Sequence, residues 1–301
     1  MKTYNKPWLS IHDQLQQLKS YGLTVGNEGA ACAFLQHINY YRFSGYGLAF
    51  ENVRHCFRPG TTFEEIREAY CFDRALRDLV TEALEIIELD LRATVAHIFG
   101  RNHKPFGHID PVNFFRTFGH SMWLDKLHEE TDRSDELFIT HYKNTYIEFP
   151  ELPIWVATEI MSFGALSRMY SGMIRQDQKD IAFRYHIQPD TLQSWIHHLV
   201  YTRNLCAHHA RLWDRKWSIS PDRPPGKDWQ TPLLPNSSRL FASLLLQGKL
   251  LYHCPAEMQF MHDWRKRVEI LLDTQTPAVP DAAARMGLPP DWKKHPFWIC
   301  L

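Results

Sequence analysis

The chain has 301 residues, 44% of them hydrophobic and 23% charged, so it can bury a sizeable core. Its 34 Lys and Arg balance 34 Asp and Glu, which excludes a uniformly basic nucleic-acid binder and confines any phosphate binding to a local patch. The apolar run 240–246 is too short to cross a bilayer, and residues 1–7 show no secretory signal. Six cysteines without a CxxC pair argue against a zinc knuckle and a disulfide framework. We therefore expect a soluble cytoplasmic protein.

Apolar residues recur at helical spacing through nearly the whole chain, and no segment shows the alternation that is typical of strands. These apolar stripes, bounded by prolines, glycines and capping residues, predict nine helical segments. They lie at about 11–21, 27–38, 62–99, 120–131, 134–147, 153–163, 189–212, 237–253 and 256–274. Gly45 and Gly47 are expected to break the helical pattern, and residues 101–119 to form an irregular connector with a short helix. The predicted fold class is all-α.

The longest apolar stripe, at 62–99, predicts one long helix or two abutting ones, and Thr62 with Glu65 forms a candidate capping box at its start. Residues 64–90 hold nine acids against three arginines, which indicates a solvated outer face. Five prolines between 221 and 235 predict a loop. The expected organisation is an N-terminal helical segment (1–60), a helical core (61–215), a Pro-rich loop (216–235), and C-terminal helices with a tail (236–301).

One segment, 201–213, gathers polar groups that are able to carry chemistry in an otherwise apolar helix. Its five main members are Arg203, Asn204, His208, His209 and Arg211. An arginine five residues before a histidine is a weak signal in a chain with 17 histidines, and Arg92 with His97 matches it too. The asparagine that follows Arg203 makes the pattern Arg-Asn-x3-His moderately specific.

A helical wheel at about 100° per residue separates these groups. A polar stripe lies along one side and comprises His197, Tyr201, Asn204, His208 and Arg211. Arg203 falls among the apolar residues, about 140° from His208, where an arginine is costly unless it has a partner. Either Arg203 pairs with an acid of the 64–90 helix and the histidines are merely exposed, or Arg203 and His208 meet at a helix–helix or subunit interface. The spacing leaves both alternatives open.

The second alternative has the groups that phosphodiester cleavage uses. A histidine takes or gives a proton near neutral pH, and a guanidinium binds phosphate oxygens and stabilises the charge that builds in the transition state. RNA supplies its own 2′-hydroxyl as the nucleophile, so this chemistry needs no metal. A shared metal is disfavoured because His197 and His208 would lie roughly 16 Å apart along one face. We expect neither a metal nor a cofactor.

Several blocks of the chain together resemble one known family. They are 39–46, 72–77, 87–92, 152–155, 159–164, 203–213 and 286–292. They are similar to the Abi-like family, the AbiD/AbiF type of bacterial abortive-infection protein, whose helical domain belongs to the HEPN superfamily. The block 203–213 resembles the superfamily's Arg-x4-6-His motif with the family's own extension. The resemblance covers nearly the whole chain, and the loop 216–235 is its least similar part.

The resemblance implies a HEPN-like helical bundle with additional N- and C-terminal helices. It also implies a metal-independent endoribonuclease of a phage-defence or toxin–antitoxin system. Carried over to this sequence, Arg203 and His208 are catalytic, Asn204 is an orienting amide, and His209 is a weaker candidate. The resemblance further implies a homodimer that juxtaposes two motifs, which would explain an arginine on an apolar helix face, and a structured non-coding RNA as a partner.

Two other functions stay open at this point. Some relatives in the superfamily bind RNA without cutting it, and a purely structural dimerisation helix would place Arg203 in a buried ion pair. Residues 203–239 hold seven basic and three acidic residues, which favours RNA contact. The candidate RNA-binding residues are Arg211, Arg215 and Lys216. An aromatic run could also stack on bases, although core packing is the favoured interpretation of Tyr40, Tyr41 and Phe43.

Overall fold

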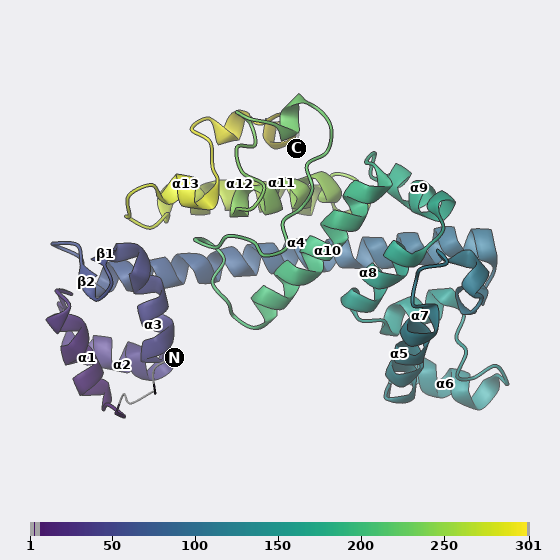
Figure 1. Cartoon of the computed structure of the whole chain (residues 1–301), viewed down its shortest axis with the longest axis horizontal. Helices are drawn as coiled ribbons and strands as arrows, with labels where there is room; N and C mark the ends of the chain where they lie inside the picture. The colour runs from purple at the N-terminus through teal and green to yellow at the C-terminus, as the bar shows by residue number, and fades with distance from the viewer. Residues whose placement is uncertain (1–2, 4–6, 300–301) are drawn as a thin grey trace.

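Helix α4 (Phe63–His103) runs along most of the molecule, and the other helices pack around it (Figure 1). This structure is a computed structural model that describes residue 3 and residues 7–299. Cys300 and most of the stretch 1–7 lie outside the described residues. Apart from one two-stranded hairpin, the regular structure in the described part of the chain is helical, so the predicted all-α class is confirmed.

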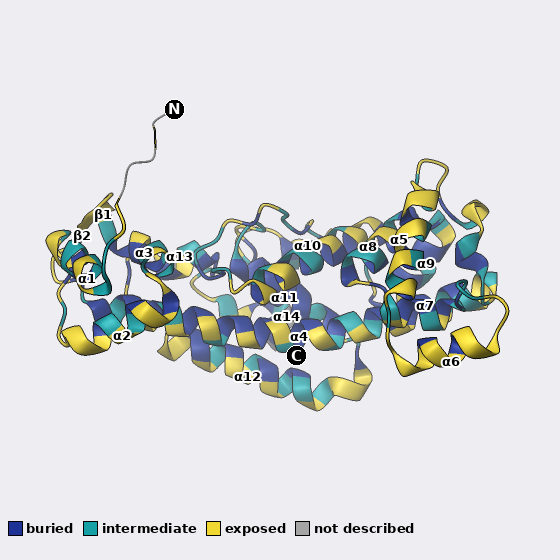
Figure 2. Cartoon of the chain, turned by 90° about the horizontal axis from the view of Figure 1, so that it is seen from below, coloured by how far each residue is buried: buried dark blue, intermediate teal, exposed yellow. Residues whose placement is uncertain are grey.

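Local sequence explains where α4 begins. The Thr62 hydroxyl accepts a hydrogen bond from the Glu65 N–H at 3.2 Å, and the Glu65 carboxylate accepts one from the Thr62 N–H at 2.7 Å. The predicted capping box is therefore confirmed. A buried stripe runs from Phe63 to Phe99 without interruption, which makes α4 one helix rather than two (Figure 2). Neighbouring helices pack against this stripe.

The N-terminal segment forms one end of the molecule (Figure 1). Its elements are α1 (Ile11–Ser20), α2 (Glu28–Ile38), α3 (Tyr40–Gly47), β1 (Glu51–Val53) and β2 (Cys56–Phe57). The prediction that Gly45 and Gly47 break the helical pattern is wrong, because both lie within α3. A Cβ at Gly47 would lie 3.3 Å from the Phe57 ring, so glycine lets α3 approach the hairpin closely. The hairpin escaped prediction because such short strands show no alternation.

Five helices gather at the opposite end of α4 (Figure 1). They are α5 (His120–Asp132), α6 (Leu137–Thr145), α7 (Ile154–Ile160), α8 (Phe163–Gly172) and α9 (Arg175–Arg184). The expected connector before α5 holds two 3-10 turns, at Gly107–Ile109 and Pro111–Asn113. The single helix predicted at 153–163 is wrong. The chain bends between α7 and α8, where the Ser162 hydroxyl accepts from the Ala165 N–H at 3.2 Å and starts a new helix.

A buried arginine of α4 holds this bend. Arg92 donates hydrogen bonds to the carbonyl groups of Thr158 and Met161, the latter at 2.6 Å, and it also pairs with Glu88. Its side chain satisfies carbonyl groups at the end of α7 that the helix itself leaves free. Arg92 is buried whereas His97 is exposed. In the second arginine–histidine match of the sequence, the arginine thus serves the core packing and the histidine does not.

The C-terminal half folds back over the middle of α4. Helix α10 (Pro189–Ala207) crosses α4 at an angle (Figure 1), and Pro189 takes its first position, as predicted. The following helices are α11 (Leu240–Leu251), α12 (Met258–Thr274), α13 (Ala282–Met286) and α14 (Pro296–Ile299). Residues 240–248 of α11 are all buried, so this helix lies inside the molecule (Figure 2).

A buried histidine joins α10 to α11. The Ile219 carbonyl accepts from His198 Nδ1 at 2.7 Å, so the neutral ring carries its proton on Nδ1 and its Nε2 accepts from the Ser243 hydroxyl. Burial lowers the pKa of His198 to about 4. The ring is therefore neutral in the folded chain at pH values where it takes up a proton in the unfolded chain.

The difference between the pKa of His198 in the folded chain and in the unfolded chain predicts that acid destabilises the fold. Between the unfolded pKa of 6.5 and the folded pKa of about 4, the unfolded chain binds more protons, so stability falls as the pH falls through this window. His198 alone is expected to remove about 2 kcal/mol of unfolding free energy between pH 7.5 and pH 5. Urea unfolding of the wild type and His198→Gln at both pH values checks this. An identical loss in both proteins would contradict the assignment to His198.

Candidate functional site

Helix α10 ends at Ala207, directly before the two histidines of the predicted motif. His208 is the C-cap residue, and His209 has a φ of 53°, in the left-handed region. The N–H groups of His209 and Ala210 donate to carbonyl groups of the last helical turn at 2.9 and 2.8 Å, in the pattern of a Schellman motif. This tight turn presents both histidines at the surface.

The predicted polar stripe is only partly correct, because the helix ends before Arg211. His197 and Asn204 are exposed on α10, as the stripe requires, but Arg211 does not continue it because the chain reverses after Ala207. The left-handed conformation costs a histidine roughly 1–2 kcal/mol, a cost that glycine would avoid. The two hydrogen bonds of the Schellman turn offset part of this cost, and contacts from outside the turn add to them.

Arg203 is exposed, so the prediction that it faces the core is wrong. Near its first turn, α10 is covered by α8 and α9. There Arg175 pairs with Asp190 at 2.6 Å, and the Tyr170 hydroxyl donates to the Pro189 carbonyl at 3.2 Å. Further along α10, Arg203 borders an open pocket and reaches solvent. A helical wheel does not show how far a neighbouring helix covers one side.

The first of the two alternatives, an ion pair between Arg203 and an acid of the 64–90 helix, is not found among the described residues. Within the described part of the chain, Asp73 pairs with Arg77 at 2.5 Å and Glu82 pairs with Arg267 of α12 at 2.6 Å. No described acid lies within ion-pair distance of Arg203, whose Nη1 donates to the Asn204 side chain of the next residue at 3.5 Å. Its guanidinium is therefore open to a ligand.

A pocket of about 550 Å³ lies between α4 and α10 beside Arg203. Its lining consists of Arg77, Asp78, Thr81, Glu82, Arg203, Cys206, Ala207 and His209. Of the two motif histidines, His209 lines this pocket, whereas His208 is exposed outside its lining. Burial raises the pKa of the Cys206 thiol to about 11, so the thiol is protonated near neutral pH and is a poor nucleophile.

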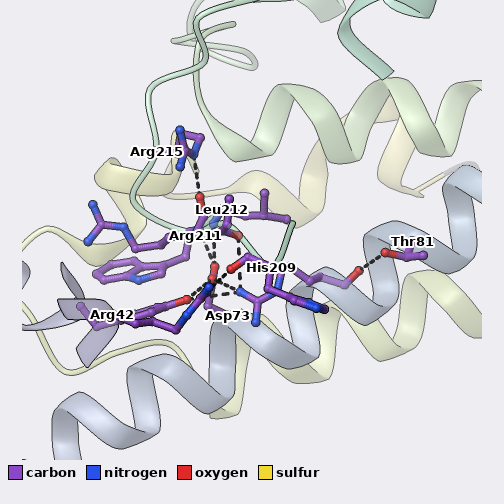
Figure 3. Close-up of polar contacts among 11 residues, drawn as sticks. Arg42, Asp73, Thr81, His209, Arg211, Leu212 and Arg215 are labelled. Carbon is purple, nitrogen blue, oxygen red and sulfur yellow. Dashed lines mark hydrogen bonds and ion pairs between the residues drawn. The ribbon is translucent and has the colours of Figure 1, made fainter. Parts of the chain in front are cut away.

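A buried carboxylate ties the segment after the turn to α4 (Figure 3). Asp73 is fully buried, and its Oδ1 accepts from the N–H groups of Leu212 and Trp213 at 2.9 and 2.8 Å. Its Oδ2 accepts from the Tyr46 hydroxyl at 2.7 Å and from Arg77 at 2.5 Å. Burial raises the pKa of the Asp73 carboxyl, and Arg77 and the other donors oppose that shift.

Two further arginines join the turn to the N-terminal segment. Arg42 of α3 donates to the His209 carbonyl, and Arg211 donates to the Gly45 carbonyl at 2.5 Å. The Arg211 guanidinium also lies over the Tyr46 ring, 6.0 Å from its centroid. Figure 3 shows these contacts meeting close to Asp73. Helix α3 therefore contacts the exit side of the turn.

The three candidate RNA-binding residues lie in different surroundings. Arg211 binds α3, as just described, and Arg215 is half-buried with its Nε donating to the Arg211 carbonyl at 2.6 Å. Lys216 is exposed. The geometry thus gives the two arginines partners within the chain and leaves the lysine to solvent. A role in RNA contact stays a prediction for all three.

Sequence reasoning missed Arg42, Asp73 and Arg77 as parts of this site. Asp73 and Arg77 did leave a signal, since an acid and an arginine four residues apart in an apolar helical stripe must be paired to be buried. Arg42 left no signal, because its partner is a backbone carbonyl 167 residues away.

The described residues, 3 and 7–299, hold no group of three or more His, Cys, Asp or Glu side chains placed to bind a metal ion. None of their helices is both long enough and apolar enough to cross a membrane.

The comparisons with known proteins bear on the same region. No curated protein and no solved structure matches the chain. The family model of Abi-like proteins matches residues 33–214, more than half of the chain. The matched part contains α3, α4, α10 and the turn with both histidines. The chain therefore belongs to the Abi-like protein family.

Proposed function

We propose that this Abi-like protein is a HEPN-type endoribonuclease that acts in bacterial phage defence, in an abortive-infection or toxin–antitoxin system. The observation that supports this most directly is the exposed, unpaired Arg203 next to a fixed turn that presents His208 and His209. A cation and a proton-transfer group at one helix end are the parts that RNA cleavage requires.

In the proposed reaction His208 takes the proton of an RNA 2′-hydroxyl. The 2′-oxygen then bonds to the adjacent phosphorus while the bond from phosphorus to the 5′-oxygen breaks, and a protonated histidine returns a proton to that leaving oxygen. Arg203 binds the non-bridging oxygens and stabilises their growing charge, and Asn204 orients Arg203. The products are a 2′,3′-cyclic phosphate and a 5′-hydroxyl.

The proposed active form is a homodimer. Arg203 and His208 are both exposed at the same end of α10, so a twofold contact at this end would bring two copies of the motif together. One protomer's arginine could then face its partner's histidine across a shared substrate.

A second candidate is a non-catalytic protein that binds a structured non-coding RNA. The observation that favours it is the mixed charge of the pocket, where Asp78 and Glu82 line the side opposite Arg203. Glu82 is already paired with Arg267, but the negative charge of Asp78 would repel a phosphate that enters the pocket. This suits binding at the rim more than transition-state stabilisation inside. Only the first candidate function includes RNA cleavage, so a cleavage assay distinguishes the two.

The decisive measurement is RNA cleavage in the presence of EDTA. We expect the wild type to cut RNA and to leave 2′,3′-cyclic phosphate or 3′-phosphate ends, because the 2′-hydroxyl is the nucleophile. His208→Ala is the matched control against a contaminating nuclease. Cleavage that stops in EDTA, or 3′-hydroxyl products, would contradict the mechanism, and tight RNA binding without any cleavage would support the second candidate.

The aromatic run beside the turn offers a further prediction. Phe43 is buried, as the favoured core interpretation requires, but Tyr41 is 84% exposed on α3, one residue before Arg42. If its ring stacks on a base, Tyr41→Ala should weaken RNA binding by about 1–3 kcal/mol, whereas Tyr41→Phe should bind normally. Titration of labelled RNA in a His208→Ala background measures this. Equal affinity for all three proteins would rule the ring out as a base platform.

A further inference from the structure

Polar contacts from α3 and α4 reach the histidine turn and the residues that follow it, among them a hydrogen bond from Arg77 Nη1 to the Ala210 carbonyl at 3.5 Å. Arg42 donates to the His209 carbonyl, so it binds the residue whose backbone is left-handed. Asp73 Oδ1 accepts from the N–H groups of Leu212 and Trp213 and fixes the chain as it leaves the turn. These contacts lie on the exit side of the turn, whereas its entry is fixed by the rigid end of α10.

The two oxygens of Asp73 serve different parts of the molecule. Oδ2 takes both side-chain donors, Tyr46 and Arg77, which belong to α3 and α4. Oδ1 takes two backbone N–H groups of the segment that follows the histidines. An ion pair that only stabilised α4 would need Oδ2 alone. The second oxygen instead connects the buried pair to the motif.

We propose that Arg42 and Asp73 are positioning residues, which hold the His208–His209 turn in the orientation that presents the histidines at the end of α10 that carries Arg203. This inference rests on the proposed function for its effect on RNA cleavage. Neither residue needs to touch substrate, because Arg42 acts through the His209 carbonyl and Asp73 through two N–H groups. Without them only the turn's own backbone hydrogen bonds would hold the histidines, and fewer chains would keep the reactive geometry.

Arg42 provides the cleaner test, because it is only half-buried and its loss should not prevent folding. We expect Arg42→Met to lower kcat about tenfold with little change in KM, since binding by Arg203 is kept while the histidines are misplaced. Arg42→Lys keeps one donor and should restore most of kcat. Arg54→Met is the matched control, because Arg54 lies in the same N-terminal segment but pairs with Glu51 on the surface.

Asp73 is tested by a pair of double variants. Asp73→Asn with Arg77→Met removes both charges but keeps a carbonyl oxygen for the Leu212 and Trp213 N–H groups. Asp73→Leu with Arg77→Met removes that oxygen as well. Amide hydrogen exchange at Leu212 and Trp213 should stay close to the wild type in the first and rise at least tenfold in the second. Exchange at α11 amides, far from the turn in sequence, reports whether each variant still folds.

These readouts separate the inference from the proposed function. Faster exchange at the turn together with a kcat loss in Arg42→Met supports both. Faster exchange in a protein whose wild type cuts no RNA supports the anchoring and overturns the proposed function. Unchanged turn exchange and unchanged kcat in Arg42→Met and in the Asp73→Leu double variant overturn the positioning role.

Discussion

Arg203→Ala and His208→Ala are each expected to lower the rate of RNA cleavage by about 10²–10⁴-fold, with little change in the free energy of unfolding. The large kinetic effect follows from the loss of a charge-stabilising group or a proton-transfer group. The small effect on stability follows from exposure, because both side chains lie at the surface. Single-turnover cleavage and urea unfolding, measured on the same preparations, test the two parts separately.

Two controls sharpen this comparison. His197→Ala removes an exposed histidine from the same helix, and His97→Ala removes the histidine of the buried Arg92 pattern. Both are expected to cleave RNA normally. His209→Ala should lose less activity than His208→Ala. The reverse result would move the catalytic assignment to His209, the histidine that lines the pocket.

Mixing the two inactive variants tests the homodimer. If one protomer's Arg203 acts with its partner's His208, Arg203→Ala and His208→Ala chains should together regain part of the activity, because some mixed dimers hold one intact site. A monomer in sedimentation at concentrations where the wild type is fully active would contradict the shared site.

Asp73→Ala is expected to cost about 3–5 kcal/mol of unfolding free energy, the largest stability effect of any substitution considered for this chain. The substitution leaves the Arg77 charge without its acid partner and removes the acceptor of two buried N–H groups and of the Tyr46 hydroxyl. Urea unfolding near neutral pH measures the change.

A surface ion pair provides the control for Asp73. Arg267 binds Glu82 through two hydrogen bonds, at 2.6 and 2.8 Å, but about half of the Arg267 side chain is exposed. Arg267→Ala should therefore cost about 1 kcal/mol or less, because water screens and replaces the lost interaction. If Asp73→Ala and Arg267→Ala lost similar amounts of unfolding free energy, the buried contacts of Asp73 would be no more stabilising than a surface ion pair, and the prediction would be wrong.

The sequence by itself determined the features that depend on neighbouring residues. The helix class, the capping box at Thr62 and the first position of Pro189 were predicted correctly, because apolar spacing, caps and proline geometry act within a few residues. The family resemblance was also visible in short blocks and was confirmed over residues 33–214.

Only the tertiary structure decided how the motif is presented. The wheel placed Arg203 on the apolar side of the helix, but its exposure depends on whether a neighbouring element covers that side, which no periodicity records. The helix was expected to continue past His209, yet it stops at Ala207 in a Schellman turn, and Arg42 and Asp73 bind the chain beyond it. Those partners lie more than 130 residues away in sequence. Local rules cannot supply them, because caps and turn hydrogen bonds act within a few residues, whereas these contacts join segments that only the fold brings together.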